Sequence, residues 1–113
     1  MGAVCCGFSD DDWQTQLEFV EQEMFAATRG LDMEKLTSGY TYTNVGEVIY
    51  GVRVHVYNDD PSKKTLLMTH GYAMAAVFHA RMLPALSQHY RIVLFDNLSF
   101  GLNDRSQNVG DAL

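Results

Sequence analysis

The apolar residues near the start of the chain recur with the period of an α-helix. Spacings of four, three and four residues place four of them in one stripe: Trp13, Leu17, Val20 and Met24. Ser9 precedes the stripe as an N-cap, residues 10–12 are acidic, and Gly30 suits a helix end. We therefore predict a helix over about residues 10–29. Its stripe could bind a partner helix or lie on a membrane, but packing on the rest of the domain is the expected arrangement.

Beyond Thr41 the period falls to two, which is typical of β-strands. Residues 48–57 alternate over their whole length and predict a long, half-buried strand. Residues 40–45 are its expected hairpin partner, with Asn44 and Gly46 near the turn.

Two short, continuous apolar runs come next. The run from Thr65 to Thr69 predicts a strand buried on both faces, and residues 91–95 predict a second buried strand. Between them, residues 73–89 predict a helix, which Pro84 would kink or restart. The element order is β-β-β-α-β, and its last β-α-β unit predicts a parallel pair with a right-handed crossover. The predicted fold class is therefore α/β, preceded by an amphipathic acidic helix.

The charge of the chain is unevenly distributed. Its formal net charge of −6 arises entirely in residues 1–35, because residues 36–113 hold equal numbers of acidic and basic side chains. We expect an acidic N-terminal segment over 1–35 and a neutral α/β segment over 36–113. Eight Lys and Arg against fourteen Asp and Glu make a poor match for phosphate backbones, so no nucleic-acid partner is expected. The length of 113 residues fits one domain with a modest core.

The N-terminus carries a candidate lipidation signal. Gly2 would be exposed after removal of the first Met, as in N-myristoylation, and Cys5 and Cys6 would lie beside the acyl chain as palmitoylation sites. Two acyl chains bind a membrane surface stably, whereas one binds it marginally. The alternative is two ordinary free thiols. Two adjacent cysteines form no disulfide framework, which fits a reducing cytoplasmic setting, with or without a membrane anchor.

The loops after the two buried strands carry the most specific pattern in the chain. The first strand ends in His70-Gly71-Tyr72, and the second leads into the sequence DNLSFGLN at 96–103. Over residues 40–107 the chain thereby resembles the N-terminal part of an α/β-hydrolase. That family has a strand ending in His-Gly, a helix, a further strand and a loop patterned Asp-x-x-Gly-x-Gly-x-Ser. Asp96 and Gly101 match the loop pattern, whereas Ser99 and Asn103 replace its first Gly and its Ser.

The resemblance implies hydrolysis of an ester, amide or lipid acyl bond. In that family a backbone N–H in the loop after the first of these strands binds the oxyanion. Position for position, the donor is the N–H of Tyr72, with Ala73 as the second choice. Four further residues would shape the two loops: His70, Gly71, Asp96 and Gly101. The alternative is that His70-Gly71 is simply a tight turn at a strand end.

The catalytic triad of that family is missing from these 113 residues. Its serine lies in a Gly-x-Ser-x-Gly elbow, followed by the acid and then the histidine. The segment most similar to this elbow is residues 97–101, around Ser99. It has Asn97 in place of the first Gly, and no histidine follows it to activate the serine. We expect Ser99 to be a loop residue and the chain by itself to be non-catalytic. The histidines lack the spacing of a zinc site, so neither a metal nor another cofactor is expected.

Three functional hypotheses follow. The chain is the N-terminal fragment of a hydrolase, a non-enzymatic scaffold or interaction subunit of a larger assembly, or an unrelated small α/β binding domain. The hydrolase resemblance predicts the sheet order 1-2-4-3, and another order would favour the unrelated domain. In that order the strand from Thr65 to Thr69 has an unpaired edge, which a protein partner or a missing C-terminal half would complete.

Overall fold

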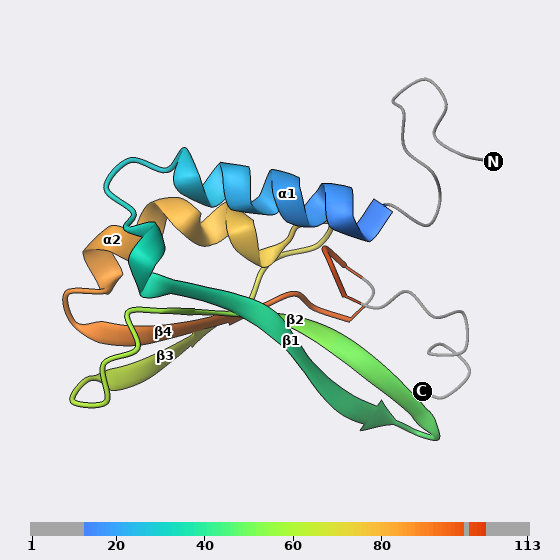
Figure 1. Cartoon of the computed structure of the whole chain (residues 1–113). Helices are drawn as coiled ribbons and strands as arrows, with labels where there is room; N and C mark the ends of the chain where they lie inside the picture. Colours follow the sequence, from blue (N-terminus) through green and yellow to red (C-terminus); the bar gives the residue numbers. More distant parts are fainter. Residues whose placement is uncertain (1–12, 99, 104–113) are drawn as a thin grey trace.

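The apolar and alternating runs form a four-stranded mixed sheet in the order β1-β2-β4-β3 (Figure 1). The computed structural model describes residues 13–98 and 100–103; the predictions for Gly2, Cys5, Cys6, Ser9 and Ser99 lie outside them. The strands are β1 (Leu36–Val45), β2 (Val48–Tyr57), β3 (Lys64–Met68) and β4 (Tyr90–Phe95). β2 pairs antiparallel with β1 and β4, while β3 and β4 are parallel. This is the strand order that the sequence predicts.

The β1–β2 hairpin is the longest paired unit of the sheet. Its register runs from Leu36 opposite Tyr57 to Val45 opposite Val48. Gly46 has φ of +63°, a backbone conformation that glycine adopts without steric cost in a two-residue hairpin turn. β1 begins four residues before the predicted start because its pairing with β2 continues to the end of that strand.

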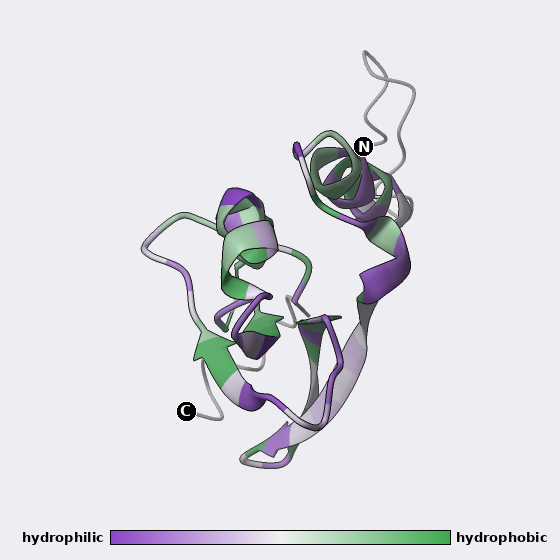
Figure 2. Ribbon diagram, turned by 90° about the vertical axis from the view of Figure 1, so that its left-hand side faces the viewer, coloured by the Kyte–Doolittle hydropathy of each residue, from purple (hydrophilic) through white to green (hydrophobic). Residues whose placement is uncertain are grey.

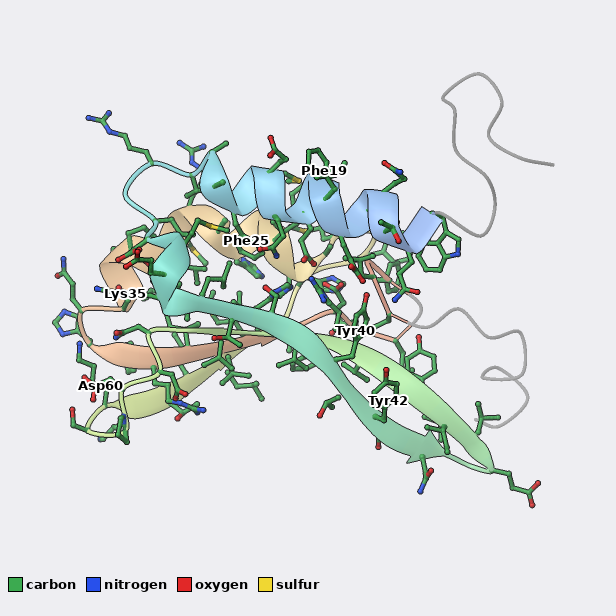
Figure 3. All side chains as sticks on the ribbon, in the orientation of Figure 1. Phe19, Phe25, Lys35, Tyr40, Tyr42 and Asp60 are labelled. Carbon is green, nitrogen blue, oxygen red and sulfur yellow. The ribbon has the colours of Figure 1, made fainter. Side chains whose placement is uncertain are left out.

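All helical segments lie on one face of the sheet (Figure 1). They are α1 (Trp13–Ala26), the 3₁₀ segments η3 (Met33–Lys35) and η4 (Ala76–Met82), and α2 (Leu83–Leu86). Apolar side chains of this layer and of the sheet form the core: Phe25, Tyr57, Ala76, Val77, Ala80, Leu83, Ile92 and Leu94. Figure 3 shows Phe25 between α1 and the sheet, whereas Phe19 points away from it.

The opposite face of the sheet is uncovered within the described residues (Figure 1). The strand register places Val56, Val93 and Leu67 in one row across this face. Leu67 is 60% exposed, and both valines are only partly buried. The prediction that β3 is buried on both faces is therefore wrong for this part of the chain, because no element covers its second face.

The packing face of α1 differs from the predicted stripe. Glu21 and Phe25 are its buried residues, while Leu17, Val20 and Met24 are exposed. Each inward residue follows a stripe residue by one position, so the helix is turned by about 100° from the predicted orientation. The hydropathy colouring shows α1 with both hydrophilic and hydrophobic residues along it (Figure 2). A polar surface on β1 and β2, described below, accounts for the rotation.

The ends of α1 also differ from the prediction. The helix ends at Ala26 rather than near residue 29, because Thr28 N–H bonds to Phe25 O and the Thr28 hydroxyl donates to Met24 O. Gly30 then turns the chain with φ of +83°. Its start is described from Trp13 onward, so the predicted residues 10–12 lie outside the described part.

The helix predicted over 73–89 is divided. Residues 71–75 form a turn and an extended residue, so helical structure begins only at Ala76. The first segment, η4, has 3₁₀ geometry, and Pro84 lies in the first turn of α2. Proline is tolerated there because the first N–H groups of a helix have no intrahelical acceptor. Pro84 therefore restarts the helix, one of its two expected effects.

Candidate functional site

The two loops singled out in the sequence meet where β3 and β4 end. Because these strands are parallel, their carboxyl ends lie at the same edge of the sheet. His70 is buried between the loops. Its Nε2 accepts a 2.8 Å hydrogen bond from Asn97 N–H, so its Nδ1 carries the proton donated to Gly71 O at 2.8 Å. Asn97 Nδ2 donates in return to His70 O at 3.0 Å.

Residues 71–74 form a tight turn directly after His70. Met74 N–H donates to Gly71 O at 3.2 Å, and Ala73 has φ of +57°. Ala73 occupies the third position of this four-residue turn, and the second position has no positive φ. This combination is that of a type II turn, in which glycine or asparagine usually occupies the third position. The left-handed conformation costs alanine about 1–2 kcal/mol. The turn is therefore strained at the residue that the sequence offered as the second oxyanion donor.

The two central residues of this turn contribute backbone N–H groups that take no part in its internal hydrogen bond. Within the described part of the chain, no hydrogen-bond acceptor reaches the N–H of Tyr72 or Ala73. The Tyr72 side chain is 91% exposed, and its ring meets the ring of Phe100 edge-on with centroids 5.8 Å apart. Two adjacent free N–H groups at the carboxyl edge of a parallel pair form a suitable receptor for developing negative charge.

Asp96 anchors the second loop to the first. It is buried, and its two carboxylate oxygens accept hydrogen bonds from Ala76 N–H at 2.7 Å and Leu102 N–H at 2.8 Å. One carboxylate thus holds the start of η4 and the end of the loop after β4. Gly101 packs directly on this carboxylate with φ of +57°, and a Cβ at Gly101 would overlap the carboxylate atoms.

Asn103 completes this network at the position where the hydrolase pattern has a serine. Its side chain is fully buried. Oδ1 accepts from Arg53 N–H at 2.6 Å, and Nδ2 donates to Asp96 O at 2.6 Å and Asn97 O at 2.8 Å. The asparagine is therefore held by three hydrogen bonds to backbone groups, one of which ties the loop to β2, while the other two close the loop on itself. In the sequence, Asn103 is visible only as a departure from the hydrolase pattern.

The sequence-predicted residues thus gather into one unit. His70, Gly71, Tyr72 and Ala73 form the first loop, and Asp96 and Gly101 belong to the second. Gly2, Cys5 and Cys6 are outside the described residues. Among the described residues, no group of His, Cys, Asp and Glu is arranged to hold a metal ion.

A buried ionic cluster beneath α1 escaped the sequence analysis. Arg53 Nη2 lies 2.6 Å from Glu21 Oε1, and its Nε donates to the same carboxylate. His55 Nε2 lies 3.1 Å from Glu21 Oε2 but off the line of a good hydrogen bond. Arg53 and His55 lie at alternate positions of β2, so the sequence places both side chains on one face of the strand. No sequence pattern near them indicates that Glu21, in a distant helix, is their partner.

The charges of this cluster shift its pKa values. Burial would raise the pKa of Glu21, but His55 and Arg53 outweigh burial and lower this pKa to about 2. Burial would lower the pKa of Arg53, but its hydrogen bonds and charge interaction with Glu21 raise it. Tyr40, labelled beneath α1 in Figure 3, has its pKa raised to about 12 by burial and by donating to Glu18 at 2.8 Å. Glu21 and Arg53 therefore stay ionised over a wide pH range.

Ser38 extends the cluster into an acid–imidazole–hydroxyl series. Its Oγ lies 2.8 Å from His55 Nδ1 and accepts from Gln22 Nε2 at 3.1 Å. The order of groups is that of a hydrolytic triad. However, His55 is fully buried, and neither Ser38 nor His55 lines a groove described below. The series is covered by α1, and its contacts hold that helix on β1 and β2.

Comparisons with known proteins identify the kind of fold. No protein-family model matches the chain, and no curated protein matches its sequence. A bacterial membrane phospholipase A, described as a virulence factor, matches with a TM-score of 0.58 at 17% identity. A protein described as a lipase of Acinetobacter baumannii matches with a TM-score of 0.54 at 21% identity.

The coverage of these matches is unequal. The two alignments include 88% and 81% of this chain but only 29% and 27% of the neighbours. The chain therefore spans less than a third of the length of either neighbour. Its fold is a small α/β fold with a four-stranded mixed sheet, similar to lipase structures. No helix among the described residues is both long and apolar enough to cross a bilayer.

Proposed function

We propose that the chain is the N-terminal part of an α/β-hydrolase that cleaves acyl bonds, with a lipid ester as the favoured substrate. Its role in that enzyme is to supply the oxyanion-binding turn, with Tyr72 N–H as the donor and Ala73 N–H as the second choice. The nucleophile, acid and histidine would come from residues beyond these 113. The lipase and phospholipase neighbours support an acyl ester over an amide.

The strained turn at Ala73 is the observation that carries this proposal. A left-handed alanine next to two unoccupied N–H groups is costly for a loop that only connects two elements. The neighbouring bonds of His70 and Asp96 hold the turn in place. Such a rigid pair of donors can bind an oxyanion without reorganising during the reaction.

The uncovered sheet supports the proposal that further polypeptide is required. Among the residues that the structure describes, β3 is paired on one side only, and Leu67 on its open face is 60% exposed. An apolar edge strand with an apolar face invites pairing. We propose that a C-terminal half, or a partner chain, adds a strand at the edge from Thr65 to Thr69 and covers this face.

The proposal is tested on the native protein isolated from its source. Its intact mass and its labelling by a fluorophosphonate, which phosphonylates activated serines with loss of fluoride, are measured together. A mass well above 12.7 kDa with stoichiometric labelling outside residues 1–113 is the expected result. Absence of labelling in the native protein and its complexes would contradict an acyl hydrolase.

The open edge and face equally suit a non-enzymatic scaffold. In that alternative, a native protein of about 12.7 kDa binds a partner through β3 and labels with no serine probe. The fluorophosphonate experiment therefore separates the two functions.

We also propose a cytoplasmic location with attachment to a membrane surface through acylated Gly2, Cys5 and Cys6. The sequence Met-Gly at the start and the adjacent thiols support it. Acyl-resin capture and mass analysis compare the wild type with Gly2→Ala. A lipid that depends on Gly2 is expected, and an unmodified wild-type N-terminus would contradict the proposal.

A further inference from the structure

A groove runs along α1 on the side of η4, and the two segments lie side by side over the sheet (Figures 1 and 2). It has two parts that share Met24, Val77 and Phe78. One part, of about 200 Å³, extends to Leu17, and the other, of about 460 Å³, extends to the turn after α1. Together they have the size of a small-molecule site.

The lining of the groove is mainly apolar and open to solvent. Leu17 is 39% exposed, Val20 49% and Phe78 55%. These side chains form the stripe of α1 that the rotation of the helix leaves outside the core, together with the facing side of η4. A contiguous apolar surface of this kind is a binding-site feature rather than scattered surface residues.

The two ends of the groove carry opposite charge. Arg29 and Arg81 line one end, and neither has an ion-pair partner among residues 13–98 and 100–103. Glu21 and Asp96 contribute to the other end, where their carboxylates are already bonded to Arg53 and to backbone N–H groups. Within the described lining, charged side chains without an ion-pair partner therefore occur only at the end formed by Arg29 and Arg81, and they are cationic.

We propose that this groove binds a long-chain fatty acid. Its carboxylate lies between Arg29 and Arg81, and its alkyl chain follows Met24 and Phe78 toward Leu17. The reverse orientation would place the ligand carboxylate beside Glu21 and Asp96, whose cationic and N–H partners are already engaged and offer it no free positive charge. This inference does not depend on the proposed hydrolysis, because Tyr72 and Ala73 do not line the groove.

Two ligand features should therefore act separately. The alkyl chain provides affinity by leaving water for the apolar lining. The carboxylate adds a charge interaction with two exposed guanidinium groups, which salt weakens. A ligand with the tail alone should bind less tightly than the acid, and a ligand with the head alone should bind least.

The experiment is an NMR titration of the native protein with laurate below its micelle concentration. The side-chain methyl groups of Leu17, Val20 and Met24 report binding in the groove. Lauryl alcohol has the same tail without the charge, and butyrate has the charge with a short tail. We expect saturable shifts of these methyl groups with laurate, binding about three- to tenfold weaker with lauryl alcohol, and none with butyrate.

Variants of the chain test which residues bind the carboxylate of the ligand and which bind its alkyl chain. Arg29→Gln with Arg81→Gln should weaken laurate about three- to tenfold and abolish its advantage over lauryl alcohol. The control, Lys35→Gln with Lys64→Gln, removes the same charge away from the groove and should leave the advantage intact. Val20→Asp should abolish binding of both ligands, whereas Phe19→Asp, on an exposed position outside the groove lining, should not.

Three results would overturn the inference. Laurate fails to shift the groove methyl groups, laurate and lauryl alcohol bind the wild type equally, or the two double variants behave alike. Far-ultraviolet circular dichroism of each variant checks that its fold is retained. All substituted side chains are exposed or line the open groove, so loss of folding is not the expected effect.

Discussion

The carboxylate of Glu21 lies 2.6 Å from Nη2 of Arg53, and this buried ion pair joins the middle of α1 to the middle of β2. The helix is therefore placed on the sheet by charge as well as by Phe25. The pairing also fixes the rotation of α1, because a helix that buried its apolar stripe would leave Arg53 without a partner. Leaving a buried charge without its partner costs about 3–5 kcal/mol, which weighs against that orientation of the helix.

Removal of one partner should be strongly destabilising. Glu21→Gln leaves Arg53 as an uncompensated charge, and we expect it to lower the free energy of unfolding by about 3–5 kcal/mol. The control Glu23→Gln changes an exposed carboxylate on the same helix and should change stability by less than about 0.5 kcal/mol. Urea denaturation measures both, and equal midpoints for the two variants would show that the ion pair does not secure α1.

Stability should fall in acid because of the same carboxylate. The pKa of Glu21 is about 2 in the folded chain against an ordinary 4.5, so the unfolded chain binds a proton at higher pH. The contribution is fully present above about pH 4.5 and is lost as the pH falls through 2. It amounts to about 3 kcal/mol. Denaturation at a series of pH values should show this decline in the wild type and its loss in Glu21→Gln; parallel curves would contradict it.

Gly101 should not accept a side chain. A Cβ there would overlap the Asp96 carboxylate, and the positive φ adds strain. We expect Gly101→Ala to destabilise the chain by at least about 2 kcal/mol. Gly39→Ala is the matched control, since no atom lies within 4 Å of the added Cβ. Thermal unfolding compares them, and a Gly101→Ala variant as stable as Gly39→Ala would mean that the loop is not held against Asp96.

Ala73→Gly should stabilise the chain. Glycine removes the strain of φ +57°, and part of this gain is offset by the greater freedom of glycine in the unfolded state. The net increase in the free energy of unfolding should be about 0.5–1 kcal/mol. In contrast, Ala85→Gly in α2 should destabilise by a similar amount. If both substitutions destabilise the chain, Ala73 is not strained.

The sequence predicted those elements whose signals are local. Residues 48–57 alternate, and β2 has these bounds. The parallel pair of β3 and β4 followed from the β-α-β order, whereas the full strand order was implied by the resemblance to α/β-hydrolases. His70, Asp96 and Gly101 were predicted to shape two loops. The hydrogen bonds of His70 and Asp96, and the close approach of Gly101 to Asp96, explain why these residue types occur there. Pro84 could be assigned a role because its missing N–H restricts it to a few helix positions.

The remaining features depend on contacts between distant residues. The rotation of α1 follows from Arg53 and His55, which lie about thirty positions away from Glu21 and leave no periodic trace in the helix itself. The strain at Ala73 could not be inferred, because alanine carries no turn signal of the kind that glycine or asparagine provides. Similarly, Asn103 departs from the hydrolase pattern, and only its three hydrogen bonds explain it.

The turn at residues 71–74 is proposed to supply an oxyanion donor, and Tyr72→Pro removes that donor. Proline suits the second position of a type II turn, so it removes the Tyr72 N–H while preserving the turn. Acyl-ester hydrolysis is measured with the native full-length protein carrying Tyr72→Pro or, as control, Tyr72→Ala. We predict that Tyr72→Pro lowers kcat about a hundred- to a thousandfold and that Tyr72→Ala retains it. Equal kcat values for the two variants, or no hydrolysis by the unmodified native protein, would contradict the account.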